Sequence, residues 1–267
     1  MKILIILTFN TNKNRTSDLV PVNWITQRKT KKKRENIMTV KKFIALTSAA
    51  VAAVALTASA QVAVDVNSAY IFRGATINDD VNVQPGFDTV IFGESTTVGT
   101  WANFNTDSSE FDEIDYFFGV TIPTGEESPI AIEVGYTEYT YPGSETEADR
   151  EPYISFAAAD LPVDLSIGFF YGIDGGIKDS LYIALDLGYG VDVAENVALG
   201  LGATVGYSDP DQGDSGFSHI TLVAGLDVGI PESDYSVTFG VAYVIETDSK
   251  VLEVDEDFYF TVGTTLL

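Results

Sequence analysis

Hydrophobic and polar residues alternate with a period of two through most of the chain beyond residue 60. From Ile114 to Ile122 every second side chain is apolar, and the segments 180–191 and 197–207 repeat this pattern. Alternate residues of a β-strand lie on one face, whereas an amphipathic helix needs a period near 3.6 residues. The pattern therefore predicts many strands and an all-β fold.

Bilayer-spanning strands need roughly 9–11 residues when tilted, and about twelve segments of this chain meet that length. Turn-forming residues such as Pro142-Gly143 separate them. Pro85 falls inside the second segment, where its missing N–H predicts a bulge or a later strand start. The predicted strands run near 62–75, 81–92, 97–105, 111–122, 129–141, 151–159, 162–172, 180–191, 197–207, 218–230, 235–245 and 256–267.

The second face of these segments decides between a membrane and a soluble fold. A soluble β-sandwich or a soluble closed barrel would expose that face to water. It holds Gly, Ala, Thr, Ser and scattered carboxylates instead of the long Lys and Glu side chains of a solvated surface. Aromatic residues on the apolar face gather at segment ends, as in the girdles of membrane barrels: Phe72, Phe104, Tyr171, Tyr207, Tyr243 and Phe258 at one end, Tyr189 and Tyr235 at the other. We therefore predict a transmembrane antiparallel up-and-down β-barrel of about twelve strands over residues 61–267.

The N-terminal residues have the pattern of an export signal. Lys41 and Lys42 precede the mostly apolar stretch 43–57, and Ala58-Ser59-Ala60 provides a small-x-small cleavage site. A retained membrane helix is the alternative, although the apolar run is shorter than the roughly 20 residues such a helix needs. We predict a cleaved signal peptide over 38–60, a mis-assigned upstream start over 1–37, and a location in the bacterial outer membrane.

Charge is distributed unevenly along the chain. Residues 61–267 contain 37 acidic residues and only four basic ones, which excludes a nucleic-acid partner because phosphate binding needs a basic surface. The absence of Cys excludes thiolate metal sites. With the apolar face outward, the inward face carries the predicted pore-lining residues Asp65, Arg73, Asp88, Asp115, Glu133, Asp164, Asp186 and Asp227.

Arg73 is the single cation of that set, and we expect it to pair with Asp88 or Asp115. Two interpretations of the acidic face remain open. Carboxylates that line a narrow pore give a preference for cations. Alternatively, they only solvate the interior or reflect a salty habitat.

Short motifs in residues 65–145 occur in an order that resembles one known family. Residues 68–74 (SAYIFRG) resemble its S-x-Y-x-F/W-R-G opening, and Gln84-Pro85-Gly86-Phe87-Asp88 resembles its Q-x-G-F/L-D segment. Residues 99–102, 115–119 and 135–142 continue the series. These motifs resemble those of the TorF-like porins of proteobacterial outer membranes. The resemblance implies a porin-type barrel without catalytic residues. The chain departs from outer-membrane barrels at its C-terminus, where Leu267 stands in place of the usual aromatic residue.

Two further groups of residues suggest other chemistry. His219, with Ser218 and Thr221 nearby, suggests a lipid-active barrel enzyme, because a hydroxyl nucleophile needs an adjacent base. A polar residue at a strand end is the simpler interpretation. The spacing of Asp209, Asp211 and Asp214 suggests a weak calcium loop, since hard oxygen ligands suit Ca²⁺. A solvated acidic loop, bridged to lipopolysaccharide by divalent cations, is the alternative.

The function predicted from the sequence is passive diffusion of small hydrophilic solutes through a channel, without a cofactor or a reaction. Phe117, Phe170 and Tyr182 are expected to narrow it. The expected partners are outer-membrane lipid, lipopolysaccharide, the solutes themselves and the barrel-assembly machinery during insertion. A plugged structural or adhesive barrel that acts through acidic loops is the first alternative, and a lipid-active enzyme using His219 is the second.

Overall fold

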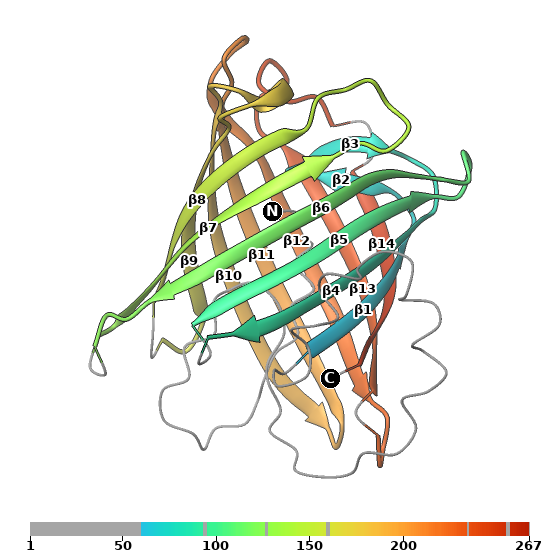
Figure 1. Cartoon of the computed structure of the whole chain (residues 1–267). Helices are drawn as coiled ribbons and strands as arrows, with labels where there is room; N and C mark the ends of the chain where they lie inside the picture. Colours follow the sequence, from blue (N-terminus) through green and yellow to red (C-terminus); the bar gives the residue numbers. More distant parts are fainter. Residues whose placement is uncertain are drawn as a thin grey trace.

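Twelve antiparallel strands close into one barrel, as the sequence pattern predicts (Figure 1). The computed structural model describes residues 60–92, 95–125, 128–158, 161–233, 235–254 and 257–266. The upstream stretch 1–37 and the predicted signal peptide lie outside these residues, apart from Ala60. The barrel strands are β1 (Ala60–Asn67), β4 (Asn82–Ile91), β5 (Thr96–Asn105), β6 (Glu110–Ile122), β7 (Ile130–Thr140), β8 (Asp149–Ala158), β9 (Asp164–Tyr171), β10 (Leu181–Ala194), β11 (Val197–Asp209), β12 (Gly216–Gly229), β13 (Tyr235–Glu246) and β14 (Phe258–Leu266).

Each barrel strand pairs with the next barrel strand along the chain, so β1 pairs with β4, and β1 also pairs with β14 to close the barrel. Connections alternate between the two ends. The end with the β4–β5, β6–β7, β8–β9, β10–β11 and β12–β13 connections is called the turn end here. The opposite end, called the loop end, carries the other connections, including a 3-10 turn at Gly175–Ile177 between β9 and β10. The loop end is uppermost in Figure 1. None of the described residues forms a helix long and apolar enough to cross a membrane.

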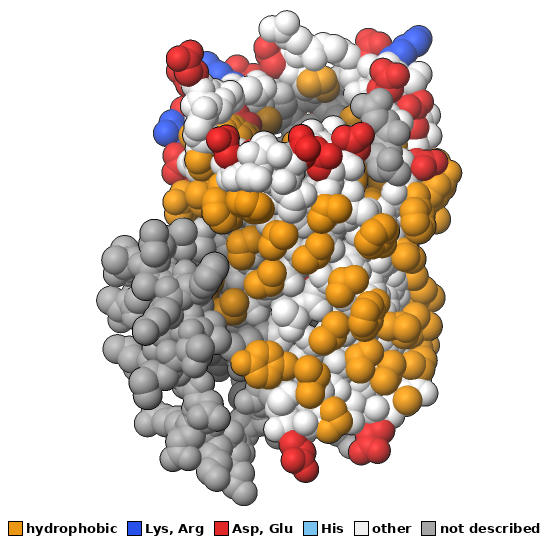
Figure 2. Space-filling view, turned by 90° about the vertical axis from the view of Figure 1, so that its right-hand side faces the viewer, with side chains coloured by type: hydrophobic (Ala, Val, Ile, Leu, Met, Phe, Trp, Pro, Cys, Tyr) orange, Lys and Arg blue, Asp and Glu red, His pale blue; other side chains and the backbone are white. Residues whose placement is uncertain are grey.

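The outer surface of the barrel is apolar between two acidic ends. Figure 2 shows a broad band of hydrophobic side chains, with carboxylates at the upper and lower rims. Leu185, Leu201 and Val241 of the barrel strands are between 38% and 46% exposed, because they point away from the barrel. Such a band matches the outward face that a membrane barrel presents to lipid. Of the predicted girdle residues, Tyr171, Tyr235 and Phe258 are exposed at strand ends. Tyr189 and Tyr243 are exposed as well, but they lie several residues inside their strands.

The strand predicted over 62–75 is wrong beyond Asn67. The chain leaves the barrel wall there and forms a separate two-stranded hairpin of β2 (Tyr70–Phe72) and β3 (Ala75–Asn78). Arg73 and Gly74 form its two-residue turn, with φ angles of 52° and 82°. Two consecutive positive φ angles are typical of a tight β-hairpin and end any extended strand. In Figure 1 this hairpin lies near the upper end of the barrel.

Two further expectations about the first strands fail. The hairpin carries Phe72 inside, against the Tyr139 ring, so Phe72 is not part of the outer girdle. The predicted bulge at Pro85 is also absent, because the β4–β5 register is the same before and after it. Pro85 interrupts only the pairing with β5, and it still lies opposite Val64 of β1. The missing N–H therefore weakens one edge of the strand without shifting it.

Candidate functional site

The inner wall carries the acidic positions that the alternation predicts. Asp115 is 2% exposed, whereas its neighbours Tyr116 and Phe118 on the other face are 48% and 45% exposed. The same alternation of faces applies along the remaining strands. It puts Asp65, Asp88, Asp115, Glu133, Asp164, Asp186 and Asp227 on the inward face of the barrel. Their role in lining a conducting passage stays a prediction.

Several of these carboxylates are held by hydroxyl groups of the neighbouring strand. Thr204 Oγ1 donates to Asp186 at 2.7 Å, and Tyr153 Oη donates to Glu133 at 2.8 Å. Thr238 donates to Asp227 in the same way, at 3.1 Å. A hydroxyl donor satisfies a carboxylate oxygen without bringing a compensating positive charge. The wall is therefore fixed in position while its acidic character is retained.

The sequence reasoning missed other acidic residues of the inner wall, among them Glu113, Asp149 and Glu151. They are between 2% and 8% exposed and lie at inward positions of β6 and β8. Glu113 is two residues before Asp115, so the alternation that placed Asp115 would also have found it. Glu151 is the most significant omission because it binds the hairpin.

Buried amide side chains form a network across β1, β4 and β5 at the loop end. Asn67 donates to Gln84 at 2.9 Å, and Gln84 donates to Asn103 at 2.9 Å. Asn103 in turn donates to Asn82 at 3.0 Å. The network cross-links the wall beside the hairpin, since an amide can both donate and accept. In the sequence, this network could have been found from Asn and Gln residues at alternate, inward-facing strand positions.

The β2–β3 hairpin lies inside the barrel and its base packs against two separate parts of the wall. Tyr70 is 2% exposed, its hydroxyl donates to Glu113 at 2.9 Å, and its ring lies 5.8 Å from that of Trp101. Ala69, which leads into the hairpin, packs into a cluster with Ala242, Val244 and Tyr259 of β13 and β14. The base of the hairpin thus reaches β5 and β6 on one side and β13 and β14 on the other.

The tip of the hairpin contacts further strands of the wall. Arg73 forms an ion pair with Glu151 of β8, and a Cβ at Gly74 would lie 2.5 Å from His219 Cγ on β12. Together with the aromatic contacts to β7, β9 and β10, the hairpin meets strands β5 to β10 and β12 to β14. It therefore narrows the barrel cross-section at the loop end.

Arg73 has a different partner from the one expected. Its Nη1 and Nη2 donate to the two oxygens of Glu151 at 2.8 and 2.7 Å. The expected pairing with Asp88 or Asp115 is wrong, because Arg73 lies in the turn of the hairpin and not on the first wall strand. A two-pronged pair between a guanidinium and a carboxylate is among the stronger polar contacts in proteins.

The aromatic residues expected to narrow the barrel lie in two places. Phe170 and Tyr182 form one cluster, with ring centroids 6.0 Å apart, beneath the Arg73 guanidinium. Phe117 lies inward elsewhere on the wall, where its ring covers Gly99 of β5. Two of the three expected residues, Phe170 and Tyr182, therefore lie where the hairpin already restricts the barrel.

His219 is buried and faces the hairpin. Ser218 Oγ lies 3.0 Å from His219 Nδ1, and the imidazole stacks on Tyr182 with ring centroids 6.2 Å apart. Within the described part of the chain, no carboxylate is hydrogen-bonded to His219. A hydrolytic triad needs such a third group to orient the base. His219 therefore packs against Gly74, and its contact with Ser218 does not form the arrangement of a nucleophile with an oriented base.

The acidic loop after β11 does not assemble a cation site. Among the described residues no group of three acidic or histidine side chains lies close enough to hold a metal ion. Asp209 instead accepts a hydrogen bond from Ser215. The backbone N–H of Asp211 donates to Ser180 at 3.2 Å.

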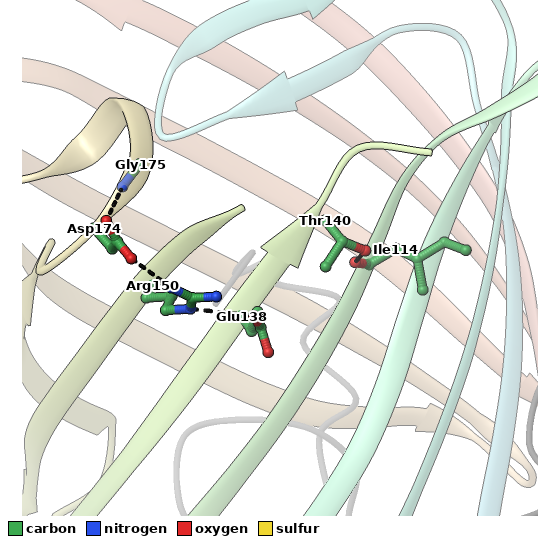
Figure 3. Close-up of polar contacts among 6 residues, drawn as sticks. All are labelled: Ile114, Glu138, Thr140, Arg150, Asp174 and Gly175. Carbon is green, nitrogen blue, oxygen red and sulfur yellow. Dashed lines mark hydrogen bonds and ion pairs between the residues drawn. The ribbon is translucent and has the colours of Figure 1, made fainter. Parts of the chain in front are cut away.

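A second arginine lies on the outside of the loop end. Arg150 of β8 pairs with Glu138 of β7 at 3.2 Å and with Asp174 of the β9–β10 loop (Figure 3). Asp174 also accepts from the N–H of Gly175, so it caps the 3-10 turn. All three charged side chains are between 33% and 44% exposed. This group clamps a loop to the rim, and solvent limits its strength.

Comparison with known proteins places the chain in a family. The sequence profile of a family described as "Bacterial protein of unknown function (Gcw_chp)" matches residues 49–265. The chain belongs to this family. The Gcw_chp match does not confirm the finer resemblance to TorF-like porins, which stays a prediction. No curated protein matches the chain.

Porins are among the solved structures that have a similar barrel. The KdgM porin is 8% identical, with a TM-score of 0.52 over 78% of this chain and 98% of KdgM. The NanC porin is 10% identical, with a TM-score of 0.52 over 78% of this chain and 100% of NanC. A KdgM complex with disordered oligogalacturonate gives 9% identity and a TM-score of 0.51, over 78% of this chain and 98% of KdgM. At these identities the likeness shows that this Gcw_chp protein has a porin fold.

Proposed function

We propose that this protein is an outer-membrane channel for the passive diffusion of small hydrophilic solutes, with a preference for cations. The apolar outer band and the porin fold support a membrane channel. Bacterial outer-membrane barrels have short turns in the periplasm and longer loops outside. The turn end, where β1 begins and β14 ends, is therefore assigned to the periplasm, and the loop end is assigned to the exterior. Export through the predicted signal peptide and delivery by the barrel-assembly machinery belong to the same proposal.

The acidic inner wall is the observation that carries the cation preference. Among the described residues, Arg73 is the one Lys or Arg side chain inside the barrel, and its two terminal nitrogens pair with Glu151. Several other inward carboxylates, Asp186 and Glu133 among them, accept hydrogen bonds from hydroxyl groups. Carboxylates in a narrow passage with low-dielectric walls focus negative potential and concentrate cations. The same wall disfavours a polyanion such as the oligogalacturonate of the KdgM complex, so that ligand is not transferred to this protein.

Reversal potentials in planar lipid bilayers test the proposal. In a KCl gradient the wild-type channel is expected to give the sign of a K⁺-preferring pore. Asp186→Asn should reduce this preference, because it removes a buried inward charge that Thr204 holds in place. Asp107→Asn, at an exposed turn of the loop end, is the matched control and should change it less. An anion-selective or unselective wild-type channel contradicts the electrostatic argument.

A plugged barrel is the second candidate, because the hairpin contacts the wall on nearly every side. Liposome swelling with a neutral pentose compares the wild type with a variant in which residues 69–79 are replaced by a short Gly-Ser linker. Faster swelling with the variant identifies the hairpin as the main restriction of the channel. If neither protein allows swelling, the barrel is structural and the channel proposal fails.

A further inference from the structure

The Arg73 guanidinium lies among three aromatic rings inside the barrel. Its central carbon is 4.2 Å from the ring centroid of Tyr182, 5.0 Å from that of Phe170 and 4.8 Å from that of Phe72. These distances are within the range at which a cation is attracted to an aromatic face. Phe72 belongs to the hairpin, whereas Phe170 and Tyr182 belong to the wall strands β9 and β10. The wall alone thus provides two ring faces for a planar cation.

A buried carboxylate completes this group. Glu151 is 2% exposed, and both of its oxygens accept from Arg73. Tyr139 Oη also donates to Glu151 at 2.9 Å and holds the carboxylate in this orientation. Paired N–H groups meeting a carboxylate edge, with rings against the cation's face, are the features that recognise a guanidinium.

The receptor and its occupant belong to separate parts of the fold. Glu151, Phe170 and Tyr182 come from three adjacent strands of the closed barrel, whereas Arg73 comes from a hairpin that forms a sheet of its own. Tyr153 and Ala184 pack with Phe170 and Tyr182 in one buried cluster. That cluster does not include the hairpin, so the ring positions depend on the wall. The receptor is therefore expected to persist when Arg73 is absent.

From this arrangement we infer that Glu151, Phe170 and Tyr182 form a binding site for a guanidinium or a similar planar organic cation. Arg73 is its internal occupant. The inference rests on the proposed function, because such a cation would reach the site as a solute of the channel. A free cation that takes the place of Arg73 removes the ion pair that ties the hairpin tip to the wall. Binding of the cation is thereby coupled to release of the hairpin.

Chemical rescue of Arg73→Ala tests this inference with methylguanidinium as the probe. The purified barrel is unfolded by heat in detergent at increasing millimolar concentrations of probe, and unfolding is followed by circular dichroism. Ligand that binds only the folded state raises the melting temperature, and here we expect a saturable rise of about 2–4 °C. The wild type should show a smaller rise, because the tethered Arg73 competes at high effective concentration.

Three controls define the site. N-methylurea has a similar shape without the charge and should produce no rise in Arg73→Ala. Adding Glu151→Gln should abolish the methylguanidinium effect, since the carboxylate is lost. Arg150→Ala removes a different arginine, which pairs with two carboxylates at an exposed position. This variant should show no probe-dependent rise in melting temperature. The same experiment is repeated with Arg73→Gln, which reduces the side-chain volume less than Arg73→Ala does.

The inference is overturned if methylguanidinium leaves both Arg73 variants unchanged, or if methylurea or the Glu151→Gln background gives the same rise. Unfolding does not depend on conduction, so this result stands apart from the channel proposal. In bilayers, methylguanidinium should reduce the K⁺ current of Arg73→Ala more strongly than that of the wild type. Absence of current in every variant would refute the channel and leave the rescue result intact.

Discussion

Gly74 illustrates how a single residue fixes the hairpin in the barrel. Its φ of 82° lies in the left-handed region, which glycine adopts without the steric penalty of a Cβ. The missing side chain also makes room for His219, whose Cγ would lie 2.5 Å from a Cβ at this position. Conformation and close contact therefore both favour glycine at the hairpin tip.

Gly74→Ala is expected to destabilise the barrel by about 1–3 kcal/mol, because a positive φ and a steric clash act together. Gly143→Ala is the matched control. Gly143 has a φ of 79°, yet only Glu110 lies near its Cβ position, at 4.0 Å. Thermal unfolding of the two variants separates the steric clash from the backbone penalty, because Gly143→Ala has only the backbone penalty. Equal losses of stability would show that His219 does not hold the tip.

Each barrel strand has an outward face that favours apolar side chains and an inward face that accepts polar ones. Leu201 of β11 points outward and is 46% exposed, whereas Ala198 of the same strand points inward. Ala198 lies directly between Asp192 of β10 and Asp227 of β12. An inward position is not automatically tolerant, because Ala184 is fully buried against Phe170 and Tyr182.

Lysine substitution should therefore distinguish the two faces. Leu201→Lys places a charge in the apolar band and should cost about 2–4 kcal/mol in a bilayer. Ala198→Lys should cost much less, because two carboxylates face the new cation. Reversible urea unfolding in lipid vesicles measures both. Similar costs for the two variants would mean that the band does not face lipid.

At the scale of the whole molecule, the closed hydrogen-bonded sheet determines how the protein responds to denaturation. Every barrel strand has two paired neighbours, including β1 and β14, so no strand edge remains for water or detergent to open. We expect the folded barrel in detergent to migrate differently on gels before and after boiling, with circular dichroism typical of β-structure. Identical migration, or a helical spectrum, would contradict the closed barrel.

The acidic surplus of residues 61–267 also acts at this scale. If the inner wall sets the selectivity, cation preference should be strongest at low salt. It should fall as KCl rises past about 0.1 M, where the Debye length is about 10 Å. Reversal potentials at a constant concentration ratio and increasing total salt measure this change. A preference that does not vary with salt would point to a narrow chemical filter instead of a diffuse field.

The alternation of single residues was sufficient to predict the number of barrel strands, their approximate limits and the inward face. This holds because a strand buried on one side and bathed by lipid on the other repeats its requirement every second residue. Asp186 and Leu185 could be assigned to opposite faces without knowledge of any partner. Glu113 and Glu151 were available from the same pattern.

The hairpin and its partners were decided only by the tertiary structure. Residues 68–74 continue the apolar alternation, so the sequence alone favoured one long strand, while the turn at Arg73 and Gly74 folds that segment into the barrel. Arg73 and Glu151 are 78 residues apart, and their contact exists because barrel closure brings β8 opposite the hairpin. Local periodicity assigns each residue to a face. Which residues meet across the interior depends on the curvature and closure of the whole sheet.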